Sequence, residues 1–307
     1  MSAGGHPLIS TNVAFAPPLD LAASLAPLGR AGDDLIDRFD GTRALRTLRL
    51  GPTEDLVAYA AEITDAADRP DQPALAAHVG SIHADRVADV GRAVRQTLLT
   101  DRSALADLAA ADEPVARLAR RYPGIVPVLF GDPFTALIRS ISAQQVNLRW
   151  AATIRGRLAE RYGTRHDVGA WEVWSLHPAP LAEARLEELR ELQLTTAKAR
   201  AVIAVAQAAQ AGELRMSDLA AMDDDELIAH LARLRGIGRW SAEWFLARTL
   251  GRPRVVAGDL GVRKAVGRLY GTPAIPSESD VRSLTAHWGA AATHAQALAL
   301  HDLAVRP

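Results

Sequence analysis

The chain contains no cysteine. This absence excludes disulfide bonds, zinc–thiolate centres and iron–sulfur clusters that depend on cysteine ligands. No apolar run is long enough to span a bilayer, and the N-terminal stretch lacks the basic and hydrophobic segments of a secretory signal. We therefore expect a cytoplasmic, intracellular protein that contacts no membrane.

Several short catalytic motifs are also missing. The nine histidines form neither an H-E-x-x-H nor an H-x-x-x-H pair, so no zinc site is expected. The chain has no G-x-x-x-x-G-K-[ST] loop for nucleotide phosphates and no G-x-S-x-G nucleophile turn. Nucleotide hydrolysis and serine-hydrolase chemistry therefore lack support.

Charge is distributed unevenly along the chain. The net charge of −1 by itself argues against a nucleic-acid-binding protein. Residues 1–100 carry 9 Arg, no Lys and 13 acidic residues, whereas residues 236–270 carry 7 basic and 2 acidic residues. A local basic face would suit a polyanionic partner, although solvated Arg-rich helices would give the same count.

The length of 307 residues allows two or three domains. We predict a mixed α+β domain over residues 1–100, with short strands over 46–50, 56–63 and 74–79 and a helix over 81–99. Residues 101–307 are predicted to be almost entirely helical. The helices expected there span 105–122, 134–162 with an interruption near Gln144 and Gln145, 181–192, 197–211, 224–234, 281–288 and 294–303. Asp223 and Glu226 have the spacing of a capping box.

The most informative stretch covers residues 231–270. Within it, Gly236 and Gly238 flank Ile237 between two helical patterns, the second of which begins near Arg239. Glycine permits positive φ and close approach of another backbone, and the free N–H groups of a helix N-terminus bind anions. This turn could therefore grip a DNA phosphate, although a Gly-rich turn between two helices is common.

Three segments together resemble a known family. LRGIGRWSAEWFLARTLG, DLGVRKA and DPFTALIRSISAQQV are similar to segments of the helix-hairpin-helix (HhH-GPD) DNA glycosylases, specifically the 3-methyladenine DNA glycosylase II branch. The early segment PPLDL resembles that branch's N-terminal strand. The resemblance covers about residues 17–303 and is strongest over 122–270.

The resemblance implies a fold and several ligands. It implies a TATA-binding-protein-like α+β domain and two helical domains flanking a DNA-facing cleft, with the helix-hairpin-helix at 224–250. It also implies a flipped base and a monovalent cation, K+ or Na+, held by the backbone carbonyls of Leu234 and Ile237, with no other cofactor required. Arg239, Arg263 and Lys264 would contact the DNA together with the hairpin.

Asp259 is the candidate catalytic carboxylate. It precedes a helical pattern in which Val262, Val266 and Leu269 share one face. Without the family it would be interpreted as an N-cap residue worth about 1 kcal/mol, with Arg263 as an alternative partner. The resemblance places it at the catalytic position, where a fixed anion would stabilise the positive charge that develops on deoxyribose during N-glycosidic cleavage.

Three tryptophans are candidates for a base pocket. Trp240 and Trp244 lie four residues apart and share a helix face, and Trp288 begins the last helical region. Core packing is the usual fate of tryptophan, but such rings also stack on extruded bases and attract cationic ones. Family members with lyase activity carry a nucleophilic Lys just after the hairpin. This chain has Trp240 there, which implies a monofunctional enzyme.

The chain departs from the family beyond these residues. Residues 289–293 replace the Pro, aromatic, Arg and Ser of close relatives, so Ala291 stands where an aromatic would stack on the base. The family's N-terminal pocket aromatic is also absent from SLAPLGRAG. Gln144 and Gln145 lie where the family inserts a side chain into the gap left by the base. Gln145 is the wedge candidate, and a polar helix cap is an equal alternative.

The combined prediction is a monomeric, monofunctional DNA glycosylase of base-excision repair, associated with the nucleoid. It would hydrolyse the N-glycosidic bond of alkylated bases, such as 3-methyladenine and 7-methylguanine, in duplex DNA. Two alternatives stay open: a glycosylase for deaminated, ethenylated or bulky bases, and a non-catalytic helix-hairpin-helix DNA-binding protein. The Ala290–Ala292 run favours the second alternative, and Asp259 opposes it.

Overall fold

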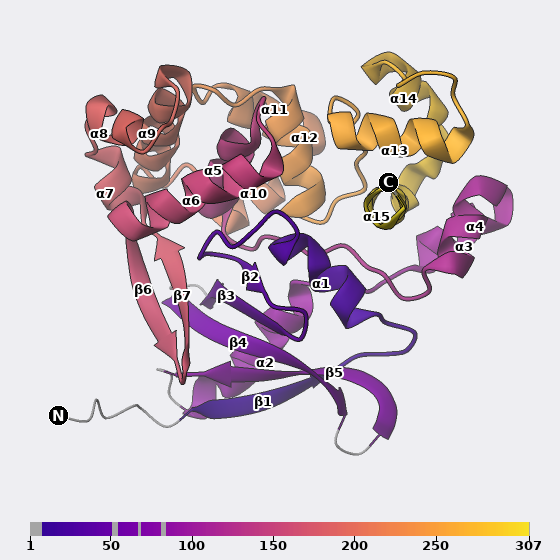
Figure 1. Ribbon diagram of the computed structural model, residues 1–307, viewed down its shortest axis with the longest axis horizontal. Helices are drawn as coiled ribbons and strands as arrows, with labels where there is room; N and C mark the ends of the chain where they lie inside the picture. The colour runs from indigo at the N-terminus through magenta and orange to yellow at the C-terminus, as the bar shows by residue number, and fades with distance from the viewer. Residues whose placement is uncertain (1–7, 51–54, 67–68, 81–83, 307) are drawn as a thin grey trace.

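The computed structural model describes residues 8–50, 55–66, 69–80 and 84–306. A five-stranded antiparallel sheet lies at one end of the molecule, and most of the rest is helical (Figure 1). The predicted fold class, mostly helical with an N-terminal α+β part, is therefore confirmed. In this described part of the chain, no helix is both long and apolar enough to cross a bilayer.

The N-terminal sheet is antiparallel throughout, with strand order β1-β5-β4-β3-β2. Its strands are β1 (Ile9–Ala14), β2 (Arg38–Phe39), β3 (Arg43–Leu50), β4 (Asp55–Ala66) and β5 (Arg69–Val79). Burial alternates strictly along β3, so one face of the strand points into the core. The sheet is accompanied by α1 (Leu21–Gly29), η1 (Ala84–Arg86) and α2 (Val87–Gln96), of which α2 packs against β1.

The strands predicted over 46–50, 56–63 and 74–79 are confirmed within β3, β4 and β5. The helix predicted over 81–99 begins at residues outside the described part and is confirmed over α2. PPLDL is not a strand. Proline offers no N–H to a β-ladder, the Pro17–Pro18 peptide is cis, and Asp20 accepts a hydrogen bond from Ala23 N at 2.8 Å as the N-cap of α1.

The remaining helices follow in order along the chain. They are α3 (Ser103–Ala111), α4 (Glu113–Arg121), α5 (Pro133–Ala143), α6 (Leu148–Tyr162), α7 (Pro178–Ala182), α8 (Leu186–Glu191), α9 (Thr196–Gln210), α10 (Met216–Ala221), α11 (Asp224–Ala232), α12 (Arg239–Arg248), α13 (Leu260–Tyr270), α14 (Glu278–Leu284), η2 (Ala286–Ala291) and α15 (Ala292–Val305). The interruption predicted at Gln144 and Gln145 and the capping box of Asp223 and Glu226 are both confirmed.

Three helix predictions need correction. The helix expected over 181–192 is split into α7 and α8, because the chain leaves the helix after Ala182 and Arg185 becomes the N-cap of α8, where its backbone N–H donates to Glu188 Oε2 at 3.1 Å. The helix expected over 105–122 is split, because Asp112 accepts a hydrogen bond from Val115 N at 2.9 Å and caps α4. The helix expected over 281–288 ends at Leu284 and gives way to the 3₁₀ turn η2.

A β-hairpin interrupts the region predicted to be almost entirely helical. It consists of β6 (Gly163–Val168) and β7 (Trp171–Leu176), joined by Gly169 and Ala170, with Gly169 at φ 63°. A two-residue loop that begins with Gly is typical of tight hairpins. The hairpin packs on β3 and β4, and the Arg43 guanidinium lies 4.0 Å from the Trp171 ring centroid. It thus attaches the helical region to the sheet.

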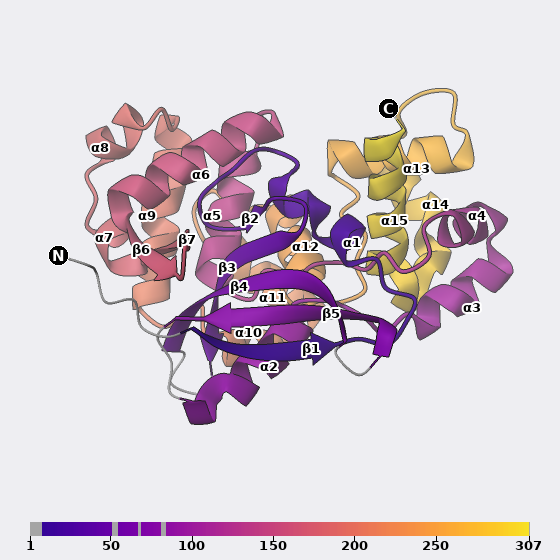
Figure 2. The same cartoon turned by 60° about the horizontal axis from the view of Figure 1, so that its bottom comes forward.

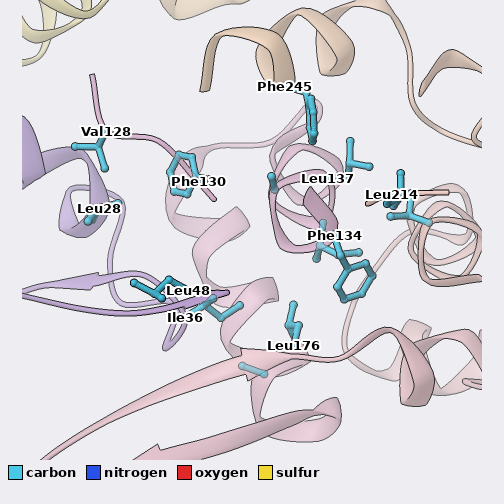
Figure 3. Packing of buried hydrophobic residues seen from close by; sticks show 14 of the residues in the cluster. Leu28, Ile36, Leu48, Val128, Phe130, Phe134, Leu137, Leu176, Leu214 and Phe245 are labelled. Atoms are coloured by element: carbon cyan, nitrogen blue, oxygen red, sulfur yellow. The ribbon is translucent and has the colours of Figure 1, made fainter. Parts of the chain in front are cut away.

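The core forms two hydrophobic clusters. The first joins the sheet to α5, α6, α9, α11 and α12, and Figure 3 shows Leu48, Phe134 and Phe245 within it. The second joins α3 and α4 to α13, η2 and α15. Figures 1 and 2 show these two groups of helices on opposite sides of the molecule, with the sheet next to both. Trp244 packs against both clusters.

A buried ion cluster connects the sheet to α5 and α6. Asp37 accepts from Arg46 Nε at 2.6 Å and from Arg139 Nη2 at 2.5 Å. Asp34 lies 2.8 Å from Arg139 Nη2 and 2.7 Å from Arg155 Nε. Burial lowers the pKa of Arg155 to about 10, which leaves it charged at neutral pH. The strand β3 and the helices α5 and α6 are thereby fixed to one loop, residues 34–37.

Phe130 lies beside this cluster and extends it toward α12. The guanidinium carbons of Arg46, Arg139 and Arg248 lie 5.4, 4.6 and 5.5 Å from the Phe130 ring centroid. Trp244 stacks on the same ring at a centroid distance of 5.4 Å and an interplanar angle of 26°. The orientation of Trp244 therefore depends on a ring that three cations surround.

Asp37→Asn should lower the free energy of unfolding at pH 7 by about 3–5 kcal/mol, because Arg46 and Arg139 lose a buried counter-charge. Burial would raise the pKa of Asp37, but the charges and hydrogen bonds of Arg46 and Arg139 outweigh burial and hold it at about 2. Since this folded pKa lies below the unfolded value of about 3.9, the stabilisation is present above about pH 4 and is lost as pH falls toward 2. Denaturant unfolding between pH 7 and pH 2 measures both effects.

The matched control is Asp167→Asn, which removes a carboxylate from an exposed ion pair with Arg165. It should change the unfolding free energy by less than about 0.5 kcal/mol. Equal unfolding free energies for wild type and Asp37→Asn at pH 7 would contradict the assigned role of the cluster.

Candidate DNA-binding and catalytic site

The hairpin between α11 and α12 has two glycines in different roles. Gly236 has φ 80°, and a Cβ built there would lie 2.5 Å from Ala201 Cβ on α9. Gly238 is the N-cap of α12, without a side-chain cap, and a Cβ built there meets nothing within 4 Å. Ile237 is buried between them. The hairpin is therefore locked against α9 at Gly236 and open at Gly238, where the N-terminus of α12 presents free N–H groups.

The carbonyls predicted to hold a monovalent cation lie in this hairpin. Leu234 O accepts from Ile237 N at 3.0 Å, and Ile237 O accepts no hydrogen bond from any described residue. Neutral carbonyl oxygens are hard ligands that suit an alkali cation. Across the described residues, no group of three His, Asp or Glu side chains could hold a metal. The hairpin thus offers Ile237 O as a carbonyl ligand without a hydrogen bond, and a K+ or Na+ ion held there stays a prediction.

Asp259 is placed where the hairpin and α13 meet. It is the N-cap of α13, and its Oδ1 accepts from Val262 N at 3.0 Å. Its Oδ2 accepts from Trp240 Nε1 at 3.2 Å, which joins the start of α13 to the first turn of α12. Arg263, the alternative partner, instead donates its Nε to Pro276 O at 2.7 Å. The carboxylate is half-buried at the positive end of a helix dipole.

The three tryptophans have different environments. Trp240 is half-buried against the second cluster, and Trp244 lies between the clusters on Phe130. Trp288 is only 1% exposed, and its Nε1 donates to Tyr270 OH at 2.8 Å. The prediction that Trp288 lines a base pocket is therefore wrong for this conformation, because no face of its ring is free to stack.

The Ala290–Ala292 run, where the chain departs from the family, is mostly buried. Ala290 is exposed, whereas Ala291 is 1% exposed and packs in the second cluster with Ala292. Gly289 has φ 46° and bends η2 at this point. Ala291 therefore leaves no exposed surface for a base in the position that an aromatic would occupy.

Gln144 and Gln145 point in different directions. Gln144 Nε2 donates to Gly236 O at 2.9 Å and lies 3.3 Å from Ser241 Oγ, so it joins the α5–α6 turn to the hairpin. Gln145 is exposed and has φ 54°, in the left-handed region that non-glycine residues rarely adopt. The structure thus separates the pair into an anchored Gln144 and a projecting Gln145.

Most basic side chains near the hairpin contact other groups of the protein, which the sequence alone did not indicate. Arg239 Nε lies 3.0 Å from the buried Glu243, and Arg263 is engaged by Pro276 O. Lys264 is exposed on α13. Arg252 and Arg254 pair with Asp224, Arg248 lies over Phe130 and Arg268 lies 3.6 Å from Asp302. Much of the local positive charge is thus neutralised within the protein.

Sequence analysis missed four residues that shape this site. Phe130 supports Trp244, Ser241 faces Gln144, and Glu243 holds Arg239. Lys198 Nζ donates to Ser142 O at 3.0 Å, at the end of α5. The i,i+4 spacing of Arg239 and Glu243 was a visible signal. The other contacts join segments distant in sequence and leave no local pattern.

Comparisons with known proteins agree with this geometry. Residues 138–290 match the family described as HhH-GPD superfamily base excision DNA repair protein. The DNA-3-methyladenine glycosylase of Bacillus subtilis is 25% identical over 184 residues, which cover 59% of this chain and 61% of that protein. The DNA-3-methyladenine glycosylase 2 of Escherichia coli is 34% identical over 133 residues, covering 43% and 45%. The chain thus matches less than two thirds of the length of these relatives.

A solved structure shows the same fold over nearly the whole chain. The 3-methyladenine DNA glycosylase of Archaeoglobus fulgidus superposes with a TM-score of 0.79 and 23% identity, covering 96% of this chain and 99% of that one. The matched family segment contains the hairpin, Asp259 and the Gln144–Gln145 turn. Through residues 138–290 the chain belongs to the HhH-GPD superfamily of base excision DNA repair proteins, and its fold agrees with that membership.

Proposed function

We propose that this protein is a monofunctional DNA glycosylase that acts as a monomer and hydrolyses the N-glycosidic bond of alkylated bases in duplex DNA. The observation that carries the proposal is the contact between Asp259 Oδ2 and Trp240 Nε1 at 3.2 Å. It brings a carboxylate, an aromatic side chain and an open helix N-terminus together from segments 19 residues apart. The named relatives support the substrate class.

The hairpin would hold the DNA backbone next to the carboxylate. A phosphate oxygen can approach Gly238, because a Cβ built at this N-cap position meets nothing within 4 Å. Free N–H groups and the helix dipole both favour an anion there. K+ or Na+ bound by the carbonyls of Leu234 and Ile237 would supply further positive charge beside the same phosphate.

Asp259 would act on the sugar of the extruded nucleotide. As the glycosidic bond breaks, positive charge develops on the deoxyribose, and a nearby carboxylate stabilises it. The hydrogen bonds from Val262 N and Trp240 Nε1 fix the carboxylate and leave lone pairs on both oxygens for the sugar or an attacking water. A base made cationic by alkylation is a good leaving group, so this stabilisation suffices.

The base would stack against the indoles of α12. Trp240 is half-buried beside Asp259, and Trp244 is held by Phe130. The buried Ala291 offers no opposing aromatic surface. This difference favours a second candidate, release of deaminated, ethenylated or bulkier bases, which a panel of lesion-containing duplexes distinguishes from alkylbase release.

Asp259→Asn should abolish base release while preserving the fold. Asparagine is as good an N-cap as aspartate, so α13 keeps its cap. Loss of the negative charge should slow release by at least about 100-fold. Single-turnover release of 7-methylguanine and 3-methyladenine from methylated duplex DNA measures the rate, and binding to an abasic-site duplex should persist.

The control is Asp223→Asn, which changes the N-cap of α11 in the same way. It should release bases at the wild-type rate. If Asp259→Asn also kept the wild-type rate, the catalytic assignment of Asp259 would be refuted.

The two hairpin glycines should respond differently to alanine. Gly236→Ala should destabilise the protein by about 2–4 kcal/mol, because it combines a left-handed φ with a clash against Ala201. Gly238→Ala should stay within about 1 kcal/mol of wild type, yet weaken DNA binding about 10–100-fold by blocking a charged hydrogen bond. Thermal unfolding and fluorescence anisotropy with a labelled abasic duplex test the pair. Wild-type affinity of Gly238→Ala would exclude a phosphate at that position.

No covalent enzyme–DNA complex should form when borohydride is added during base release. Lyase chemistry needs an amine that attacks the sugar, and the chain has only two lysines, Lys198 and Lys264. Lys198 is engaged at Ser142 O, and Trp240 follows the hairpin in place of a lysine. Gel analysis after borohydride treatment measures trapping. A trapped complex that disappears in Lys264→Met would contradict the monofunctional assignment.

A further inference from the structure

Glu243 is a buried carboxylate on α12 that has two arginine partners. Its exposed fraction is 1%. Its Oε1 lies 3.0 Å from Arg239 Nε and 2.9 Å from Arg282 Nη2, and its Oε2 accepts from the same Arg282 nitrogen at 3.1 Å. A carboxylate is buried at an acceptable cost only when it is paired. Glu243 therefore fixes α14, which carries Arg282, to α12.

Arg282 extends this contact to the first turn of α14. The nitrogen that binds Glu243 also donates to Glu278 Oε1 at 2.6 Å. Burial would lower the pKa of Arg282, but the hydrogen bond to Glu278 and the charge of Glu243 outweigh burial and raise it. One guanidinium nitrogen thus joins two carboxylates, a buried one on α12 and an exposed one on α14.

Glu278 lies directly against the turn that carries Asp259. A Cβ built at Gly258 would be 3.2 Å from Glu278 Oε2 and 3.8 Å from Trp240 Cδ1. Gly258 is therefore enclosed between the Glu278 carboxylate and the indole whose Nε1 donates to Asp259. Because Asp259 follows Gly258 in the chain, a shift of Glu278 would remove the support from one side of the catalytic turn.

The loop before α14 is held by α13. Arg263 Nε donates to Pro276 O at 2.7 Å, and a Cβ built at Gly267 would lie 2.7 Å from Pro276 Cδ. Figure 1 shows α14 next to α13, on which it packs. Neither of these contacts involves α12. The position of Glu278 relative to Trp240 therefore depends on the pair of Arg282 and Glu243.

We propose that Glu243 and Arg282 are positioning residues for base release, which hold Glu278 against Gly258 and thereby keep the Asp259 carboxylate beside Trp240. The inference rests on the proposed glycosylase function. Neither residue has to touch the DNA or the extruded base. Misplacing a catalytic group by about 1 Å can slow a reaction about 100-fold, so the pair controls the rate of bond cleavage rather than the affinity for DNA.

Arg282→Met tests the inference, because Glu243 keeps Arg239 as a partner and the fold is preserved. Single-turnover release of 7-methylguanine from methylated duplex should slow about tenfold. Affinity for an abasic-site duplex should stay within about twofold of wild type, and its salt dependence should not change, because no phosphate contact is lost. A residue that only stabilised the fold would lower the unfolding midpoint without separating rate from affinity.

Arg282→Lys is the conservative variant. The contacts of Arg282 with both carboxylates come from one nitrogen, Nη2. A lysine ammonium also offers several N–H donors at a single point, so this variant should recover the release rate to within about threefold of wild type.

Glu278→Ala breaks the same link at its exposed end, where a substitution changes stability little. It should slow base release as Arg282→Met does. The double variant should be no slower than either single variant, because the two residues act as a unit. The matched control is Arg120→Met, which removes an arginine from the exposed pair with Glu113 on α4 and should match the wild type in rate and affinity.

The outcomes separate the inference from the function on which it rests. Wild-type release rates in Arg282→Met and Glu278→Ala would overturn the positioning role alone. Equal losses of release rate and abasic-site affinity, or an Arg282→Lys protein as slow as Arg282→Met, would overturn it as well. A wild-type protein that releases no base from methylated or other lesion-containing duplexes would instead overturn the proposed function.

Discussion

The buried ion cluster around Asp34 and Asp37 constrains α5, α6 and the turn between them, which would meet DNA under the proposed function. It fixes Arg139 of α5 and Arg155 of α6 to a loop of the N-terminal unit. A partner that moved away would leave a buried charge without compensation, at a cost of several kcal/mol. The relative positions of α5 and α6 are thereby set, and Arg155 carries the constraint onward to Ser142, at the start of the turn that presents Gln145. The N-terminal unit thus positions a surface that it does not itself form.

The site is assembled across the boundary between the two hydrophobic clusters. α12 contributes Phe245 and Leu246 to the first cluster, whereas its Trp240 packs against the second cluster and donates to Asp259 at the start of α13. Trp244 contacts both clusters. A change in the spacing of the clusters would therefore move the hairpin, whose Ile237 is in the first cluster, relative to Asp259. Packing far from the DNA consequently determines whether the catalytic geometry exists.

Local sequence patterns predicted the features that depend on local chemistry. The Asp223–Glu226 capping box and the helix break after Ala143 are properties of a few neighbouring residues, and both are present. The patterns failed where the structure of a segment depends on contacts with residues that are distant in the sequence. Trp288 is buried because α3 and α15 pack on η2. The β6–β7 hairpin forms in a helical region because β3 and β4 give it a surface to cover, although its Gly169-Ala170 turn was a readable signal.

A nearly neutral protein needs a particular way to recognise DNA. Most arginines of residues 236–270 are engaged by Asp224, Glu243, Asp302, Pro276 O or the Phe130 ring, so free charge for a long phosphate contact is scarce. Weak general attraction reduces binding to intact duplex, where counterion release supplies the affinity. Under the proposed function, recognition would then depend on groups that act at a deformed site, such as the open N-terminus of α12 and the strained Gln145. Because few basic side chains are left unpaired, the proposed function would rely on discrimination between damaged and intact DNA more than on high affinity for either.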